Sequence, residues 1–214
     1  VIPDSVINIG ISAFSECKNL ESVTLSKGLE KIGENAFYNC DSLQSIEIPK
    51  SLKDVYATYD SIDTPNGVFN ECDNLKTIAF EEGSTVIADA LFRGCDGLES
   101  IVISDTITQI YGYAFADCKN LKNINISDSV TVLGENVFQN DTSITEINLP
   151  DSITALGRGV FSGCDRLKSI VIPDSVTNIG ISAFSECKNL ESVTLSKELE
   201  KIGENAFYNC DSLQ

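Results

Sequence analysis

The sequence predicts a β-rich solenoid of nine stacked 23-residue modules, and three regularities support this fold class. The eight cysteines are separated by 23, 32, 23, 23, 46, 23 and 23 residues. These gaps are single modules, one double module and one module that carries nine additional residues. Nine of the ten phenylalanines repeat with the same spacing. The third regularity is the pattern L-x-x-I-x-I at the start of the modules.

The two columns contain every cysteine and all but one phenylalanine, so chance does not explain them. The phenylalanine column is Phe14, Phe37, Phe69, Phe92, Phe115, Phe138, Phe161, Phe184 and Phe207. The cysteine column is Cys17, Cys40, Cys72, Cys95, Cys118, Cys164, Cys187 and Cys210, with Asp141 where a ninth cysteine would stand.

Each module is expected to begin with a strand, as residues 167–187 (LKSIVIPDSVTNIGISAFSEC) show. Ile170 and Ile172 alternate with Ser169 and Val171, which is the pattern of a strand with one buried face. Residues 173–175 (Pro-Asp-Ser) then favour a turn.

A second, shorter strand is expected to follow this turn, because Val176 and Ile179 start another apolar stretch. After it, Ala183, Phe184 and Cys187 have helical spacing, which predicts one short helical turn. No module buries its apolar side alone, so the stacked columns are expected to form one continuous core.

The combined pattern L-x-x-I-x-I-P-x-x-V-x-x-I-G-x-x-A-F-x-x-C resembles the 23-residue leucine-rich repeats of BspA type, over the whole chain. The resemblance implies a curved solenoid with a parallel sheet on its concave side. Members of that family are mostly surface or secreted proteins, and several are implicated in adhesion to host or matrix proteins. The family has no general catalytic motif. We therefore expect an extracellular or cell-surface protein that binds a protein or glycan ligand and is not an enzyme.

The composition narrows the possible partners. The net charge of −17 argues against nucleic acid, whose phosphates are bound by Lys and Arg, and against anionic membrane surfaces. No apolar run approaches the length of a membrane span, so no membrane insertion is expected within this segment. The chain has no histidine, which is the commonest general base and metal ligand. We expect no catalytic residues, no metal and no cofactor.

A longer repeat lies above the 23-residue period. Residues 1–44 match residues 171–214 at 42 of 44 positions, and only Ile7/Thr177 and Gly28/Glu198 differ. The offset of 170 residues equals seven modules plus the nine-residue insertion. We therefore expect residues 1–214 to be one continuous solenoid and an excerpt of a longer array. A structural fibre or stalk that associates end to end is the alternative function.

The insertion is the most informative candidate site. Twelve residues separate Val55 from Val68 where other modules have three, so a loop is expected over residues 56–67. Two tyrosines of another module are predicted to lie on the same edge, about 10 Å away. The candidate binding residues are Tyr56, Tyr59, Asp60, Asp63, Tyr111 and Tyr113. Tolerated insertion without a ligand is the competing interpretation, and a calcium site at Asp60, Asp63 and Asn66 is a weaker one.

Three further features leave alternatives open. The cysteines are expected to be buried, reduced thiols, although neighbouring modules lie within disulfide range. The exposed positions of the first strands, such as Asn123 and Asn125, are small and lack aromatics, which favours a solvated face over the main binding surface. Asn125 and Asn140 begin N-x-S/T triplets, which are glycosylation acceptors only in a secretory host.

Overall fold

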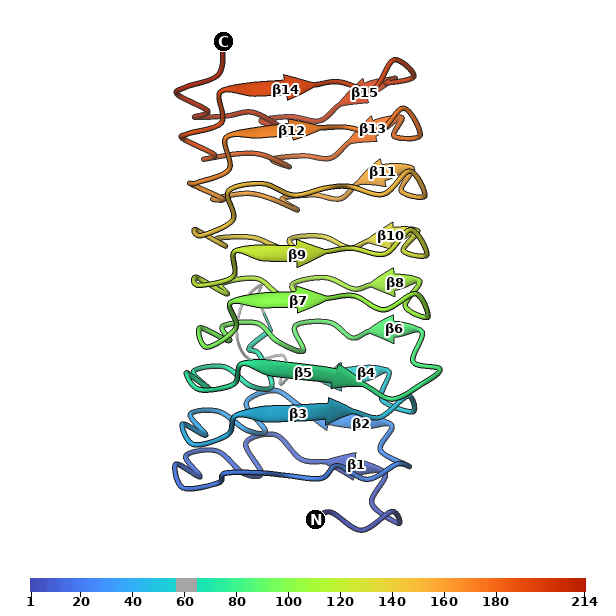
Figure 1. Ribbon diagram of the computed structural model, residues 1–214, viewed down its shortest axis with the longest axis vertical. Helices are drawn as coiled ribbons and strands as arrows, with labels where there is room; N and C mark the ends of the chain where they lie inside the picture. The colour runs from blue at the N-terminus through green and yellow to red at the C-terminus, as the bar shows by residue number, and fades with distance from the viewer. Residues whose placement is uncertain (57–64) are drawn as a thin grey trace.

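The computed structural model describes residues 1–56 and 65–214, and these wind into a stack of similar turns. The amino terminus lies at one end of the stack and the carboxyl terminus at the other (Figure 1). In the described part of the chain the regular elements are short strands, arranged in two columns whose arrows point in opposite directions (Figure 1). The predicted leucine-rich repeat solenoid is confirmed in this architecture.

The first column holds the strand that opens each module, and its strands pair in parallel. These strands are β3 (Ser45–Ile48), β5 (Thr77–Phe80), β7 (Ser100–Val102), β9 (Asn123–Asn125), β12 (Ser169–Val171) and β14 (Ser192–Thr194). The pairs are β3 with β5, β7 with β9 and β12 with β14. Ile101 faces Ile124, one 23-residue period later, and Ile46 faces Ile78, across the enlarged module. The isoleucines face the core, while the alternate residues of these strands are exposed.

The second column is made of the shorter strands that follow the first turn of each module. These are β1 (Asn8–Ile9), β2 (Lys31–Gly33), β4 (Asp54–Tyr56), β6 (Val86–Ile87), β8 (Gln109–Ile110), β10 (Val132–Leu133), β11 (Ala155–Leu156), β13 (Asn178–Ile179) and β15 (Lys201–Ile202). They form three parallel sheets, in the orders β1-β2-β4, β6-β8-β10 and β11-β13-β15.

The expected short helical turn is wrong for the described residues, which contain no helix. The segment after the second strand is a pair of tight turns, with left-handed φ angles of 55° at Ser182 and 63° at Glu186. Alternate backbone N–H groups donate to the next module instead of to their own. In this module the donors are Ser182, Phe184 and Glu186, and the acceptors are the carbonyls of Glu204, Ala206 and Tyr208. In a helix these backbone N–H groups would donate to carbonyls of the same segment, so hydrogen bonding between stacked modules favours the pair of turns.

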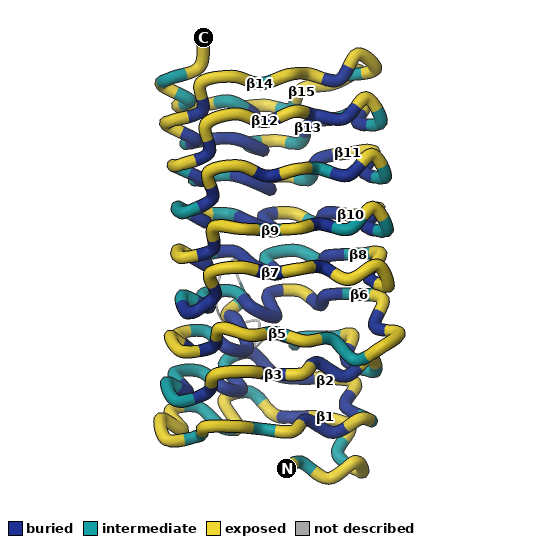
Figure 2. Tube along the Cα trace, in the orientation of Figure 1, coloured by how far each residue is buried: buried dark blue, intermediate teal, exposed yellow. Residues whose placement is uncertain are grey.

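The core runs along the axis of the stack, enclosed by the two strand columns and the turns (Figure 2). Successive rings of the phenylalanine column stack with centroids 5.1–5.9 Å apart and planes within 17° of each other. Phe80, which lies outside the column, meets the Phe92 ring edge to face at 6.2 Å. Burial of each ring therefore depends on the module on either side of it.

The cysteines of the described residues are free thiols, and they form a second ladder beside the rings. Cys118 Sγ donates to the carbonyl oxygen of Phe92 at 3.1 Å, and Cys187 Sγ donates to that of Phe161 at the same distance. Burial raises the pKa of the Cys187 thiol to about 12. Six of the eight cysteines are buried, Cys210 is partly exposed and Cys17 is exposed.

Candidate functional site

The enlarged module places its insertion between β4 and the turn that begins near Val68. Three of the candidate residues, Tyr59, Asp60 and Asp63, lie outside the described residues. The structure describes the end of the insertion from Pro65 onward. The described part of the site therefore consists of β4, which leads into the loop, and of the segment from Pro65 onward, which follows the loop.

The tyrosines predicted to share one edge have different surroundings. Tyr56, the last residue of β4, donates its hydroxyl to the carbonyl of Ile9 at 3.1 Å. Tyr111 donates to Gln109 Oε1 at 2.7 Å. Tyr113 has a left-handed φ of 54°, which is rare for a bulky residue. Its ring lies 5.4 Å from the guanidinium carbon of Arg93. Arg93 thus contacts both Tyr113 and the end of the insertion, whereas the Tyr56 hydroxyl is hydrogen-bonded to the backbone of another module.

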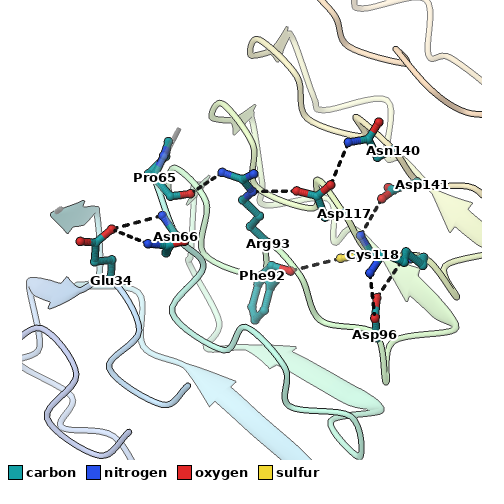
Figure 3. Close-up of polar contacts among 11 residues, drawn as sticks. Glu34, Pro65, Asn66, Phe92, Arg93, Asp96, Asp117, Cys118, Asn140 and Asp141 are labelled. Atoms are coloured by element: carbon teal, nitrogen blue, oxygen red, sulfur yellow. Dashed lines mark hydrogen bonds and ion pairs between the residues drawn. The ribbon is translucent and has the colours of Figure 1, made fainter. Parts of the chain in front are cut away.

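Arg93 is the residue that sequence reasoning missed. Its Nη1 donates to the carbonyl of Pro65 at 2.6 Å, and its Nε donates to Asp117 Oδ2 at 2.9 Å (Figure 3). Asp117 Oδ1 in turn accepts from Asn140 Nδ2 at 2.9 Å. The Arg93 side chain is only 19% exposed, so this ion pair is partly shielded from solvent. One planar guanidinium thus joins the returning loop to the next module.

The returning segment is held from its other side by Glu34. Both the backbone N–H and the side-chain amide of Asn66 donate to Glu34 Oε2, at 3.2 and 3.4 Å (Figure 3). Gly67 follows, and a Cβ at this position would collide with the carbonyl oxygen of Arg93. A side chain at position 67 would therefore push the loop away from Arg93. We call Pro65, Asn66, Arg93, Tyr113 and Asp117 together the Arg93 edge.

A polar hollow of about 530 Å³ adjoins the Arg93 edge and crosses four successive modules. Carboxyl groups dominate its lining, with Arg93 and Lys119 as cations. The carboxyl residues of the lining are Asp41, Glu71, Asp73, Asp96 and Asp117. Partial burial raises the pKa of Asp73 above its ordinary value, and the carboxylates of Asp96, Asp41 and Glu71 raise it further. The hollow therefore disfavours additional negative charge.

Tyr38 lies near the same hollow and was not among the predicted site residues. Its hydroxyl donates to Glu71 Oε2 at 2.7 Å, and this bond raises the pKa of Tyr38. The available signal was its place in the sequence, since it directly follows a phenylalanine of the column. That position holds Arg93 in the module after the insertion.

The calcium hypothesis stays untested, because Asp60 and Asp63 lie outside the described residues. Asn66, one of its three residues, is engaged by Glu34. Among the described residues there is no cluster of three or more acidic, cysteine or histidine side chains suited to a metal ion. The same residues include no helix with the length and apolar character needed to cross a membrane.

The exposed side of the first strand column, which we call the first-strand face, offers a contrasting surface. It carries Asn123 and Asn125 on β9 and two exposed valines, Val102 (70%) and Val171 (64%). Apart from Glu47 on β3, the residues at its exposed strand positions are small or aliphatic, and no ring projects from it within the described strands. Tyrosine and arginine side chains, which are typical of interface hot spots, are thus found at the Arg93 edge and not on the first-strand face.

Known proteins place the chain in a family. The BspA type leucine rich repeat region matches residues 1–61, 61–190 and 156–214, in six copies. No curated protein matches the chain significantly.

Solved structures with similar folds come from several bacteria. A leucine-rich repeat protein from Bacteroides ovatus is 26% identical, with a TM-score of 0.50, over 100% of this chain and 70% of that one. A leucine rich cell surface protein from Faecalibacterium prausnitzii is 24% identical, with a TM-score of 0.57, over 100% and 76%. The Treponema pallidum (T. pallidum) leucine rich repeat protein is 22% identical, with a TM-score of 0.58, over 97% and 78%. With the matched repeats spanning the chain from end to end, this protein belongs to the BspA-type leucine-rich repeat family.

Proposed function

We propose that this protein is a non-enzymatic binding scaffold at the cell surface, and that it acts in adhesion by holding a protein ligand at the Arg93 edge. The family membership and the cell-surface description of the Faecalibacterium prausnitzii protein support the location. The absence of histidine from the sequence supports a role without catalysis.

The single observation that carries the choice of surface is the fixed return of the insertion. An insertion that merely extends a loop needs no anchor, but Arg93 and Glu34 hold this one from two sides. Arg93 contacts the anchored segment, lies over the ring of Tyr113 and lines the polar hollow. Tyrosine and arginine are the residue types that dominate interface hot spots. Pre-ordered side chains also lose less conformational entropy when a partner binds.

Adhesion to immobilised extracellular-matrix proteins tests this proposal. The purified chain is measured against a panel of such proteins, with a glycan array alongside, and Tyr113→Ser is compared with Tyr208→Ser. Tyr208 is an exposed tyrosine of the last module, so it controls for loss of a surface ring. We expect Tyr113→Ser to weaken binding at least about 30-fold, the scale of a hot spot, and Tyr208→Ser to leave it unchanged.

The first-strand face supplies the contrary outcome. If Asn123→Ala and Asn125→Ala weaken binding while Tyr113→Ser does not, the Arg93 edge is not the binding surface. Binding that appears only on the glycan array would replace the protein ligand with a carbohydrate.

A structural fibre is the second candidate, and one comparison favours it. Residues 1–44 recur as residues 171–214 at 42 of 44 positions, so the same modules begin two successive 170-residue blocks. Ile32 of the first copy is fully buried by the module that follows it. Blocks that repeat in this way can stack on one another by the same contacts, and head-to-tail contacts of this kind tend towards filaments. Sedimentation across a concentration series tests end-to-end association, and a monomer at every concentration would refute it.

A further inference from the structure

Asp141 occupies a place in the thiol ladder that every other described module fills with cysteine. In this ladder each Sγ donates to the backbone carbonyl of the phenylalanine in the preceding module. The donors are Cys40, Cys72, Cys95, Cys118, Cys164, Cys187 and Cys210, at distances of 3.0–3.2 Å. For Asp141, the corresponding acceptor is the carbonyl of Phe115, 26 residues earlier.

A thiol in this ladder both donates and accepts. Cys118 donates to Phe92, and its sulfur accepts a hydrogen bond from the backbone of Cys95. Asp141 reproduces the accepting half, because its Oδ1 takes the backbone N–H of Cys118 at 2.8 Å (Figure 3). Its Oδ2 is buried and has no hydrogen-bond partner among the described residues. An ionised carboxylate cannot donate, whereas a carboxylic acid can do both.

The surroundings of Asp141 disfavour a negative charge. The side chain is fully buried, and the charged groups that act on it are the carboxylates of Asp117 and Asp96. The cations of this region are engaged by those two acids, Arg93 by Asp117 and Lys119 by Asp96. Burial first, and then the two carboxylates, raise the pKa of Asp141 well above its usual range, against one lowering contribution from the Cys118 N–H.

The thiols on either side do not compensate for a charge at this position. Burial raises the pKa of Cys118 and of Cys164 well above the ordinary thiol value, so both remain neutral near pH 7. The Cys164 thiol in turn accepts a hydrogen bond from the backbone of Asp141. A buried carboxylate with one unpaired oxygen and no cation would be strongly unfavourable.

We propose that Asp141 is held as a neutral carboxylic acid and that its Oδ2–H donates to the Phe115 carbonyl, so that one proton completes the ladder in the middle of the solenoid. Loss of this proton at higher pH removes the donor and leaves a buried charge between Cys118 and Cys164. Asp141 thereby makes this junction sensitive to pH, unlike the cysteine junctions.

The direction of the pH effect follows from proton linkage. A folded-state pKa above the unfolded value, which is about 3.9, gives stability that is complete below that value. This stability is lost as the pH rises, until the folded group itself ionises. Two substitutions remove the titration while keeping a donor and an acceptor, namely Asp141→Asn and Asp141→Cys. Relative to either variant, the wild-type unfolding constant should increase about tenfold per pH unit above about pH 5, until the folded carboxyl group itself ionises.

Urea unfolding of the three chains across this pH range measures the ratio. The same tenfold slope against both variants supports the proposal, because Asn and Cys differ in size and chemistry but both lack the carboxyl group. A ratio that does not change with pH would overturn it. A carbon-13 label on the Asp141 carboxyl gives a reading that needs no variant. A chemical shift of the protonated acid at pH 7 supports the proposal, and that of a carboxylate refutes it.

Discussion

Phe37 and Phe207 are the same residue in two copies of one 44-residue sequence, and they differ in how their rings are covered. Phe37 is fully buried between Phe14 and Phe69, with ring centroids at 5.1 and 5.3 Å. Phe207 is partly exposed and stacks on Phe184 alone, at 5.3 Å. Their local sequences are nearly identical, so the pair isolates the contribution of the neighbouring module.

We expect Phe37→Ala to lower the free energy of unfolding by about 3–5 kcal/mol, the usual cost of removing a buried phenylalanine. Each stacked ring pair contributes about 0.5–1.5 kcal/mol beyond burial, and Phe37 loses two pairs where Phe207 loses one. With one face uncovered, Phe207→Ala should cost about half as much, roughly 1.5–2.5 kcal/mol.

Equilibrium unfolding in urea, followed by circular dichroism, measures both losses on the same scale. The wild-type chain is the reference, and equal slopes of free energy against urea for all three chains show that the same transition is compared. If the two substitutions cost the same, the rings would be stabilised within their own modules. That result would refute the view that stacking between modules makes the core.

The other predictions concern single contacts. Thiol labelling of the native chain should modify Cys17 rapidly, and the six buried cysteines only after unfolding; rapid native labelling of all eight would contradict the ladder. Gly67→Ala should lower the free energy of unfolding by about 1–3 kcal/mol, because its Cβ collides with the Arg93 carbonyl; an unchanged urea midpoint would show that the loop moves freely. Arg93→Lys should lose the combined contacts to Pro65 and Asp117, because an ammonium has no planar fork; amide hydrogen exchange at residues 66–68 should accelerate, and unchanged exchange would show that Arg93 is not the anchor.

Much of the fold was predictable because the pattern repeats. Phenylalanine and cysteine repeat every 23 residues, and apolar residues such as Ile170 alternate with polar ones in the first strands. The sequence therefore assigns the same positions to the core in every module. The structure pairs the first strands in that register and keeps their isoleucines inside. A periodic sequence is readable in this way because the neighbours of each residue are its own counterparts one module away.

The turn after the second strand shows where a local pattern was ambiguous. The spacing of Ala183, Phe184 and Cys187 fits a helical turn, and it equally fits two tight turns that place the same side chains inward. The choice depends on where the backbone N–H groups go, and here Ser182 and Phe184 donate to the following module. That requirement exists only once the modules are stacked.

The insertion was predictable from the sequence, but the contacts of its described end were not. The insertion and its turn residues mark an irregular edge, and Tyr113 does lie beside the returning segment through Arg93. The role of Arg93 and the inward hydrogen bond of Tyr56 could not be foreseen from spacing. Each joins residues that are unrelated by the repeat and are brought together by the path of one particular loop.

The sequence alone therefore determined the module, its strands, its core columns and the location of the irregular edge. The tertiary structure decided which thiols are covered, how the insertion is anchored and that Asp141 accepts the backbone N–H of Cys118. The physical reason is that the same positions are buried in every module, so burial appears in the sequence as a 23-residue period. Hydrogen bonds between different modules involve single pairs of residues, and only the stacking of those modules brings such pairs within reach.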